Sequence, residues 1–280
     1  MGARITPRMV AHAGVAPFPL DYGARVKARR GIFVAPFAEL ADPRVLADLA
    51  AATEAAGFDG FFVWDHIRYT PAGLAVADPW IALAAVACAT ERVRIGPLVT
   101  PLSRRRVAKL ARETVTLDQL SGGRLVLGVG LGSDSHGELG PFGEISDPRE
   151  RAQLLDGGLT RLTELWDGEF NPRPVQRPRI PVWVGARWPN RPPLRRAARF
   201  DGIFPVDVDQ PEQLAELVAV MRELRDPSAG PFEVVVTGPP EREIRPWEEA
   251  GATWCLTGFG SEPSAARVRE TIAAGPGAVG

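Results

Sequence analysis

Several kinds of residue and motif are scarce or missing in this sequence, and each absence excludes a class of protein. Only two cysteines occur, Cys88 and Cys255, far apart and in apolar surroundings. Two are too few for a disulfide scaffold or a zinc site, so we expect both to be small buried residues. The chain has no run of about 18 apolar residues, and we therefore expect no transmembrane helix.

An excess of charge of either sign is also missing. The 280 residues carry a formal net charge of −1, which creates no field to attract nucleic acid or an anionic membrane. The pair Arg29-Arg30 is followed by only a short apolar stretch before Glu39, so it does not suit a twin-arginine signal. We expect a cytoplasmic protein with neither nucleic acid nor membrane as a partner.

Residues with intrinsic chemical reactivity are few. Histidine occurs three times, at His12, His66 and His136, and no carboxylate cluster surrounds any of them in the sequence. A G-x-S-x-G elbow, a Walker loop, an H-E-x-x-H motif and an H-x-H pair are all missing. We expect no metal site, and the shortage of reactive side chains favours a bound redox cofactor that carries the chemistry.

What the sequence does contain is a repeated strand–helix pattern. Short apolar runs predict eight strands, at 31–37, 58–64, 93–100, 124–130, 180–185, 200–206, 232–238 and 252–257. The clearest predicted helices lie at 42–57, 78–91, 104–123, 147–168 and 211–224. Eight such units in this length predict an α/β protein with a (β/α)8 TIM barrel, and an open doubly wound sheet is the competing architecture.

The chain divides into two parts of unequal size. Residues 1–30 carry several arginines and little acidic charge without an apolar period, so we expect a loose basic N-terminal arm. An upstream extension of the reading frame without a structural role explains these residues equally well. Residues 31–280 are expected to form a single barrel domain.

Polar residues follow the second predicted strand, where a barrel carries its active site. Asp65 and His66 come directly after the apolar run 58–64, and the carboxyl ends of barrel strands line the pocket. Histidine titrates near neutrality, so His66 is a candidate for proton transfer. The alternative is a structural histidine at the barrel rim, and its position alone does not decide between the two.

Other strand ends also carry candidate features. Pro97 within a strand predicts a bulge, and the alternative is a simple kink into the next helix. Gly128 and Gly130 would let a flat ligand approach the backbone, whereas a dinucleotide fingerprint is weak because Ser133 replaces the third glycine. His136 follows in a glycine-rich loop and faces either a substrate or the solvent.

The segment 182–199 combines a strand, a tight turn and a basic helix. Amides after Gly185, the helix start near Pro192, and the side chains of Arg187 and Arg191 together predict a phosphate site. The alternative is that the arginines of this helix form a solvated face.

Linked motifs across most of residues 31–257 give the sequence a family resemblance. The run "ADPWIALAAVACATERVRIGPLVTPLSRRRVAKLARETVTLDQLSGGRLVLGVGLG" (77–132), the preceding "WDH", and the later "PRPVQRPRIPVWVG" and "RRAARFDGIFP" carry it. Together they resemble the bacterial luciferase-like family of flavin-dependent oxidoreductases. The resemblance implies a (β/α)8 barrel that binds FMN, or the deazaflavin coenzyme F420, at the carboxyl ends of its strands.

The resemblance also implies roles for particular residues. It makes His66 the catalytic residue beside the reactive ring, and it implies a non-prolyl cis peptide near Pro97 and Leu98 that backs the ring. The residues it implies for cofactor binding are Asp65, Pro97, Leu98, Thr100, Gly128, Val129, Gly130, Gly185, Ala186, Arg187, Asn190 and Arg191. On the substrate side we expect Arg68, Ser133 and His136.

Two departures from the family pattern bear on function. Sugar-oxidising F420 members carry a glutamate right after the strand-four glycines, where this sequence has Ser133, which argues against sugar dehydrogenation. The segment 167–173 is shorter than the hairpin that many relatives carry, and this predicts an opened pocket or an incomplete cofactor site. The loops 66–77, 131–147 and 167–180 are expected to select the substrate.

The first functional expectation is a monooxygenase that uses reduced FMN and dioxygen on a small organic substrate, with a flavin reductase as its partner. One alternative is an F420-dependent oxidoreductase that transfers a hydride with the assistance of His66. Another is a non-catalytic luciferase-like partner subunit, motivated by the short segment 167–173. The family resemblance further implies a homodimer.

Overall fold

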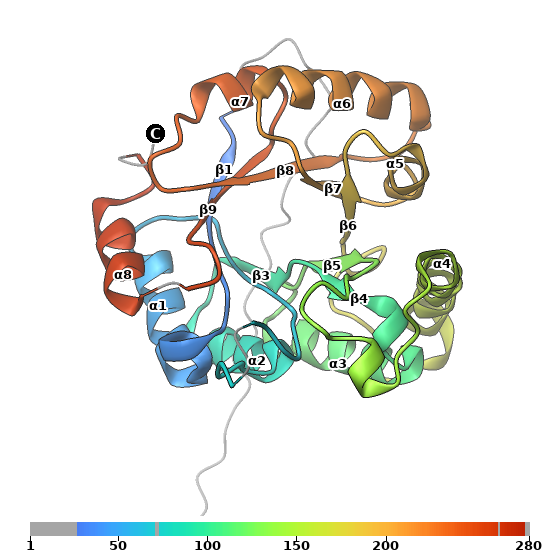
Figure 1. Ribbon diagram of the computed structural model, residues 1–280, viewed down its shortest axis with the longest axis horizontal. Helices are drawn as coiled ribbons and strands as arrows, with labels where there is room; N and C mark the ends of the chain where they lie inside the picture. The colour runs from blue at the N-terminus through green and yellow to red at the C-terminus, as the bar shows by residue number, and fades with distance from the viewer. Residues whose placement is uncertain (1–26, 71–72, 263, 278–280) are drawn as a thin grey trace, which may run out of the picture.

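A ring of parallel strands forms the centre of the molecule, and helices surround it (Figure 1). The computed structural model describes residues 27–70, 73–262 and 264–277. The order of neighbours is β3-β2-β1-β9-β8-β7-β6-β5-β4. The strands are β1 (Arg29–Val34), β2 (Gly60–Val63), β3 (Arg94–Pro97), β4 (Thr100–Pro101), β5 (Leu127–Gly130), β6 (Val182–Arg187), β7 (Gly202–Val206), β8 (Glu233–Gly238) and β9 (Trp254–Gly258).

The strands close into a barrel at two places. The first and last strands, β1 and β9, pair in parallel. The remaining seam is joined by Ile95, whose N–H donates to the Arg124 carbonyl at 3.1 Å and whose carbonyl accepts from the Val126 N–H at 2.8 Å. β4 continues β3 beyond the cis peptide Leu98–Val99 and pairs with β5. The predicted (β/α)8 barrel is therefore confirmed, and the open doubly wound sheet is excluded.

Apolar residues fill the barrel interior as well as the layer outside it. The rings of Phe62, Trp183 and Trp254 lie inside, with centroids 5.4 to 5.7 Å apart. Glycines make room for them: a Cβ on Gly60 would lie 2.5 Å from the Phe62 ring, and one on Gly202 would lie 2.5 Å from Trp183. Strands buried on both faces are apolar throughout, which explains the continuous runs in the sequence.

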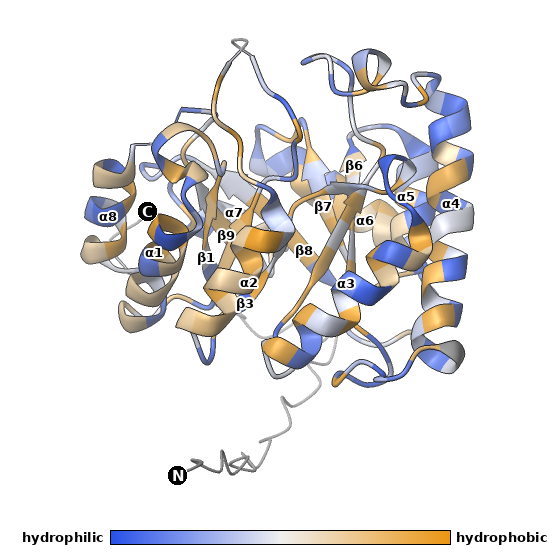
Figure 2. Ribbon diagram, turned by 90° about the horizontal axis from the view of Figure 1, so that it is seen from below, coloured by the Kyte–Doolittle hydropathy of each residue, from blue (hydrophilic) through white to orange (hydrophobic). Residues whose placement is uncertain are grey.

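Helices cover the outside of the barrel and carry their polar residues outward (Figure 2). The helices α1, α2 and α4 each begin at an Asp-Pro pair, in which the aspartate accepts N–H bonds from the first turn. The α-helices are α1 (Pro43–Ala55), α2 (Pro79–Ala89), α3 (Val107–Leu120), α4 (Pro148–Glu164), α5 (Arg191–Ala197), α6 (Pro211–Leu224), α7 (Arg245–Glu249) and α8 (Ala265–Ala274). Shorter helical segments are 3-10 turns at Ala38–Ala41, Leu102–Arg104 and Gly140–Phe142, and a π turn at Leu165–Glu169. No helix in the described ranges is long and apolar enough to cross a membrane.

The amino-terminal boundary of the barrel lies earlier than predicted. β1 begins at Arg29, and Arg29 and Arg30 pair in register with Trp254 and Cys255 of β9. These two arginines therefore belong to the barrel and not to an arm that ends at residue 30. Residues 1–26 of the expected arm lie outside the described residues.

The segment before β6 lies at the amino ends of the strands. The Val175 and Gln176 N–H groups donate to Asp118 at 2.6 and 3.2 Å, and the Gln176 amide nitrogen donates to the Leu125 carbonyl at 2.7 Å. Arg94, the first residue of β3, donates to the Gln176 side chain at 2.8 Å. The expectation that this segment shapes the pocket is therefore wrong, because helix-to-strand connections lie opposite the carboxyl ends in a parallel barrel.

The two cysteines differ in their surroundings. Cys255 is buried, and its burial raises the thiol pKa to about 12, as expected for an inert core residue. Cys88 is exposed near the end of α2, so the expectation of a buried residue is wrong there.

Candidate functional site

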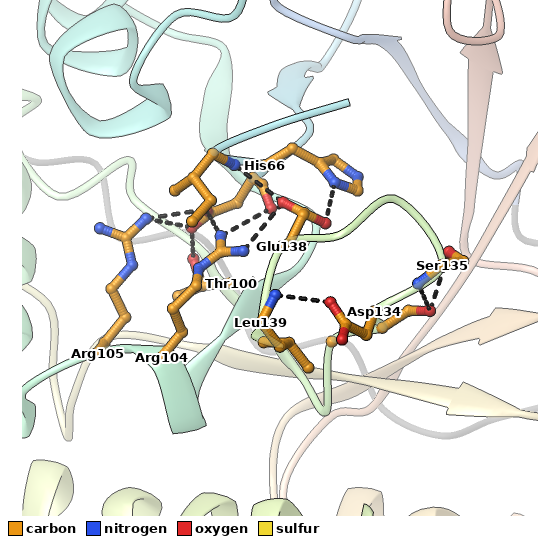
Figure 3. Close-up of polar contacts among 12 residues, drawn as sticks. His66, Thr100, Arg104, Arg105, Asp134, Ser135, Glu138 and Leu139 are labelled. Atoms are coloured by element: carbon orange, nitrogen blue, oxygen red, sulfur yellow. Dashed lines mark hydrogen bonds and ion pairs between the residues drawn. The ribbon is translucent and has the colours of Figure 1, made fainter. Parts of the chain in front are cut away.

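Asp65 follows β2 and anchors the carboxyl end of that strand. Its carboxylate accepts hydrogen bonds from the Thr100 hydroxyl at 2.7 Å, from Arg104 at 2.9 Å and from Arg105 at 2.8 and 2.9 Å (Figure 3). The Asp65 side chain has no exposed surface. All of these donors are protein groups. Asp65, Thr100, Arg104 and Arg105 therefore form a fixed frame for the site, held together by the Asp65 carboxylate.

The two arginines that bind Asp65 precede a helix instead of opening it. The sequence predicted a helix from residue 104, but α3 begins at Val107, after the 3-10 turn 102–104. Cationic side chains are unfavourable in the first turn of a helix because of its dipole. Arg104 and Arg105 instead bind a carboxylate at the end of the neighbouring strand, β2.

Glu138 is the second buried carboxylate of the site, and it contacts His66. Its Oε2 atom lies 2.7 Å from His66 Nδ1, and its Oε1 atom accepts from the Ile67 N–H at 2.9 Å and from Arg104 at 3.0 Å (Figure 3). Arg104 therefore joins Asp65 and Glu138. His66 does not bond Asp65 directly but is linked to it through Glu138 and Arg104.

The surroundings of Glu138 favour its ionised form. Burial by itself raises the pKa of Glu138, but the hydrogen bond and charge of His66, the Ile67 N–H and the charge of Arg104 outweigh it. The pKa of Glu138 consequently lies below the usual range of glutamate. At neutral pH the site therefore contains a buried carboxylate beside a histidine.

A folded loop presents Glu138 to His66. The side chain of Asp134 accepts from the Leu139 N–H at 2.7 Å and from the Gly140 N–H at 3.3 Å. Arg151 of α4 donates to the carbonyls of Leu131 and Gly132 at 3.0 and 2.8 Å. These bonds hold the start of the loop that follows β5 and close the turn that carries Glu138, so Glu138 is held by its own segment as well as by its partners.

Aromatic rings surround His66. Ring centroids of Phe37, Trp64 and Tyr69 lie 5.8, 5.7 and 5.1 Å from that of His66. His136 stacks on Tyr69 at 3.8 Å, and its Nδ1 atom lies 2.9 Å from the Thr70 hydroxyl. The ring centroid of His136, a residue expected to face the substrate, thus lies 6.2 Å from that of His66.

Glycines allow the neighbouring strands to pack closely beside the cis peptide Leu98–Val99. A Cβ on Gly130 would lie 2.4 Å from Val99, one on Gly185 would lie 3.3 Å from it, and one on Gly128 would lie 2.3 Å from the Pro97 carbonyl. Leu98 and Val99 belong to the cluster inside the barrel. Glycine is therefore required at these strand positions, because a larger residue would collide with the chain around the cis peptide.

The arginine expected to bind phosphate has a carboxylate partner. Arg187 at the end of β6 forms an ion pair with Asp207, just after β7, and both side chains are more than half exposed. Asn190 donates its N–H to the Arg187 carbonyl at 3.0 Å. Arg191 is exposed at the start of α5, where Pro192 and Pro193 supply no amide N–H. A phosphate at this place would therefore meet side chains more than the N–H groups of a helix terminus.

The remaining predicted residues occupy less direct positions. Val129 and Ala186 contribute their buried side chains to the main hydrophobic core, so only their backbone atoms remain for a cofactor. Ser133 is exposed and bonds Ser135 at 3.1 Å. Arg68 is half-buried, with its guanidinium beside Gly137.

Sequence reasoning missed Glu138, Arg104, Arg105 and Asp207. For the arginines a signal existed, since three consecutive cations at a helix start need anionic partners. Glu138 stands 72 residues from His66, and no local pattern connects the two. Asp207 adopts a φ of 64°, which a sequence pattern does not reveal for a residue other than glycine.

The chain matches known proteins both in sequence and in fold. A family model described as luciferase-like monooxygenase matches residues 24–270. The F420-dependent glucose-6-phosphate dehydrogenase of Nakamurella multipartita is 39% identical over 199 residues, which cover 62% of this chain and 53% of that protein. The chain thus spans about half the length of this curated relative.

Solved structures share the architecture at low identity. An F420-dependent secondary alcohol dehydrogenase, in complex with an F420-acetone adduct, gives a TM-score of 0.74 at 19% identity and covers 91% of this chain and 99% of its own. The oxygenating constituent of 3,6-diketocamphane monooxygenase from Pseudomonas putida, in complex with FMN, gives a TM-score of 0.64 at 16% identity. That match covers 76% of this chain and 67% of the monooxygenase chain. These structural likenesses show the fold, and the family model matches most of the sequence. The chain therefore belongs to the luciferase-like monooxygenase family.

Proposed function

We propose that this protein is an F420-dependent oxidoreductase that transfers a hydride between an alcohol or carbonyl substrate and the deazaflavin. The observation that carries the proposal is the contact between the buried carboxylate of Glu138 and the partly exposed His66, 2.7 Å apart at the carboxyl end of β2. The names of two similar proteins support the cofactor and the reaction type, since one is an F420-dependent glucose-6-phosphate dehydrogenase and the other an F420-dependent secondary alcohol dehydrogenase.

A hydride transfer of this kind needs a residue that accepts a proton. When a C–H hydride leaves an alcohol carbon, the hydroxyl proton must leave as well, and the carbonyl C=O bond forms. The bound deazaflavin supplies the acceptor for the hydride. His66 would take the hydroxyl proton at Nε2, the ring nitrogen not turned to Glu138, and the buried carboxylate would stabilise the resulting imidazolium.

The residues of the mouth fit a planar cofactor. Val99, Gly130 and Gly185 would support the ring, and the aromatic side chains around His66 would exclude water from it. Arg187 and Arg191 would hold a phosphate group, with Arg187 leaving Asp207 to do so. Ser133 in place of the glutamate of sugar-oxidising members favours an alcohol other than a sugar as the substrate.

The second candidate is an FMN-dependent monooxygenase that uses dioxygen and receives reduced flavin from a partner reductase. The apolar, aromatic surroundings of His66 favour it, because they would limit the access of water to a reduced ring. The proton-accepting pair favours the F420 reaction over it. The non-catalytic partner subunit loses the observation that motivated it, since the short segment before β6 lies at the opposite end of the barrel.

The test is a side-by-side titration of the purified protein with F420 and FMN, followed by cofactor fluorescence. We expect micromolar binding of F420 and weaker binding of FMN. Binding of FMN alone would overturn the proposal in favour of the monooxygenase. Failure to bind either cofactor would reject both candidates.

We further propose a homodimer in which a second copy of this chain covers α2. This helix contains no charged residue, and Ile81 on it is 65% exposed. A charge-free face needs no complementary ion pairs, which suits a self-contact across a twofold axis. Ile81→Glu should reduce the mass of the particle in multi-angle light scattering from dimer to monomer, whereas Leu120→Glu, at an exposed position at the end of α3, is the matched control.

A further inference from the structure

The two carboxylate oxygens of Glu138 have different partners. Oε1 accepts two hydrogen bonds, from the Ile67 N–H at 2.9 Å and from Arg104 at 3.0 Å. Oε2 faces His66 Nδ1 at 2.7 Å. The Glu138 side chain is 3% exposed, so water does not compete for either oxygen.

These partners also prevent Glu138 from exchanging its two oxygens. Arg104 is tied to Asp65 through a second nitrogen at 2.9 Å, which fixes the direction from which it donates. The Ile67 N–H belongs to the backbone and cannot turn away. The loop on which Glu138 stands is closed by Asp134. Oε2 is therefore the oxygen that remains for His66.

A buried carboxylate determines which histidine nitrogen carries a proton. An ionised carboxylate has no proton to donate, so the close contact with His66 requires a hydrogen on Nδ1. In a neutral imidazole the other nitrogen, Nε2, is then an acceptor. Without such a partner, either nitrogen can carry the proton.

We propose that Glu138 is the positioning residue of this site: it holds His66 as the Nδ1-protonated tautomer and thereby leaves Nε2 as the proton acceptor. The use of that acceptor in turnover rests on the proposed function, whereas the tautomer itself does not. The arrangement has the same logic as a carboxylate that orients a catalytic histidine, where the wrong tautomer abolishes most of the rate.

A single substitution should reverse the tautomer. In Glu138→Gln the amide oxygen must stay where Oε1 is, because Ile67 and Arg104 both donate there. The amide NH₂ then takes the place of Oε2 and donates to Nδ1. His66 must accept at Nδ1 and carry its proton on Nε2, so the nitrogen left for the ligand changes from an acceptor to a donor.

The experiment is NMR of the full chain labelled with ¹⁵N-histidine, recorded at about pH 9, where histidine is ordinarily neutral. The chain has three histidines, and the His66 signals are those lost in His66→Gln. We expect the Nδ1-protonated pattern for the wild type and the Nε2-protonated pattern for Glu138→Gln. An Nε2-protonated wild type would overturn the proposal, and so would an unchanged pattern in Glu138→Gln.

Two further variants separate positioning from general structure. Glu54 is a matched control: it is a mostly buried carboxylate that accepts three backbone N–H bonds from residues 91–93 and touches no histidine. Glu54→Gln should leave the His66 pattern unchanged, and a change there would overturn the specific role of Glu138. Glu138→Asp keeps an acceptor-only group, and we expect it to retain the Nδ1-protonated pattern in at least part of the molecules.

Turnover then tests the link to the proposed function. We expect Glu138→Gln to lower kcat at least about tenfold with F420, with a smaller change in KM. If the tautomer reverses and turnover does not change, the positioning role of Glu138 stands and the proposed use of His66 fails. The two hypotheses can therefore fail separately.

Discussion

Ion pairs between arginine and aspartate occur on two sides of the barrel mouth, and they differ in exposure. On the β2 side, Arg104 and Arg105 bind Asp65, and the side chains of Arg104 and Asp65 are 4% and 0% exposed. Across β6 and β7, Arg187 binds Asp207, and these side chains are 63% and 51% exposed. The same chemical pairing is thus buried in one place and solvated in the other.

The difference in exposure implies a difference in role. Removing one partner of a buried pair leaves an uncompensated charge, which is strongly unfavourable, whereas water compensates an exposed pair. The buried pairs are therefore a fixed frame that supports Glu138 and His66. The exposed pair can open at little cost, so an incoming anion can replace Asp207 at Arg187.

The largest expected effect comes from breaking the buried frame. Asp65→Ala leaves Arg104 and Arg105 without that carboxylate, and we expect the free energy of unfolding to fall by about 3–5 kcal/mol. Urea unfolding followed by circular dichroism measures it. The matched control is Asp207→Ala, for which we expect a change within about 1 kcal/mol. Equal losses in the two variants would show that burial does not distinguish the pairs.

The second prediction concerns the residue that the frame supports. His66→Ala should fold normally and lower turnover at least about tenfold, because proton transfer by a positioned side chain contributes that much or more. Steady-state kinetics at saturating F420 measures it, with circular dichroism as the check on folding. Unchanged turnover at full cofactor occupancy would remove His66 from the mechanism.

The third prediction concerns the pH dependence of the frame. The folded-state pKa of Glu138 is lowered, so the ionised carboxylate stabilises the fold above the range where free glutamate titrates, about 4.3. That contribution is lost as the pH falls through the lower folded-state value. The wild type should therefore be more stable than Glu138→Gln at pH 7, and the difference should shrink towards pH 3. Chemical denaturation across this range measures it, and a difference that grows on acidification would contradict the assignment.

The smallest expected effects belong to the exposed pair. Arg187→Ala should weaken the binding of the phosphate-bearing cofactor more than that of a riboflavin-like fragment. Asp207→Asn should strengthen the binding of the phosphate-bearing cofactor by about two- to fivefold, since Asp207 competes with the phosphate for Arg187. Fluorescence titration with both ligands measures these changes. If Arg187→Ala weakens the two ligands equally, the phosphate is bound elsewhere.

The parts of the site that could be predicted are those that lie next to a strand end. Asp65, His66, Gly128 and Gly130 each follow or end an apolar run, and the carboxyl ends of barrel strands converge in space. The non-prolyl cis peptide was expected near Pro97 and Leu98, and it occurs at Leu98–Val99. Local pattern and barrel topology are sufficient for such residues.

The partners of these residues could not be predicted in the same way. The carboxylate of Asp65 accepts hydrogen bonds from Thr100, Arg104 and Arg105, of which the nearest in the chain is 35 residues away. The segment 167–173 was expected near the pocket, although its place between a helix and a strand puts it at the opposite end. The partners of Asp65 depend on pairing over long distances in the chain, whereas the place of segment 167–173 follows from barrel topology.

The sequence by itself determined the architecture, because the apolar runs and the Asp-Pro helix starts act through local preferences and through burial on both strand faces. It also determined which residue types stand at the carboxyl ends of the strands. Only the tertiary structure decided how their charges combine. Coulombic and hydrogen-bonding partners are selected by proximity in space, and closing the barrel brings Glu138 to His66 and Asp207 to Arg187.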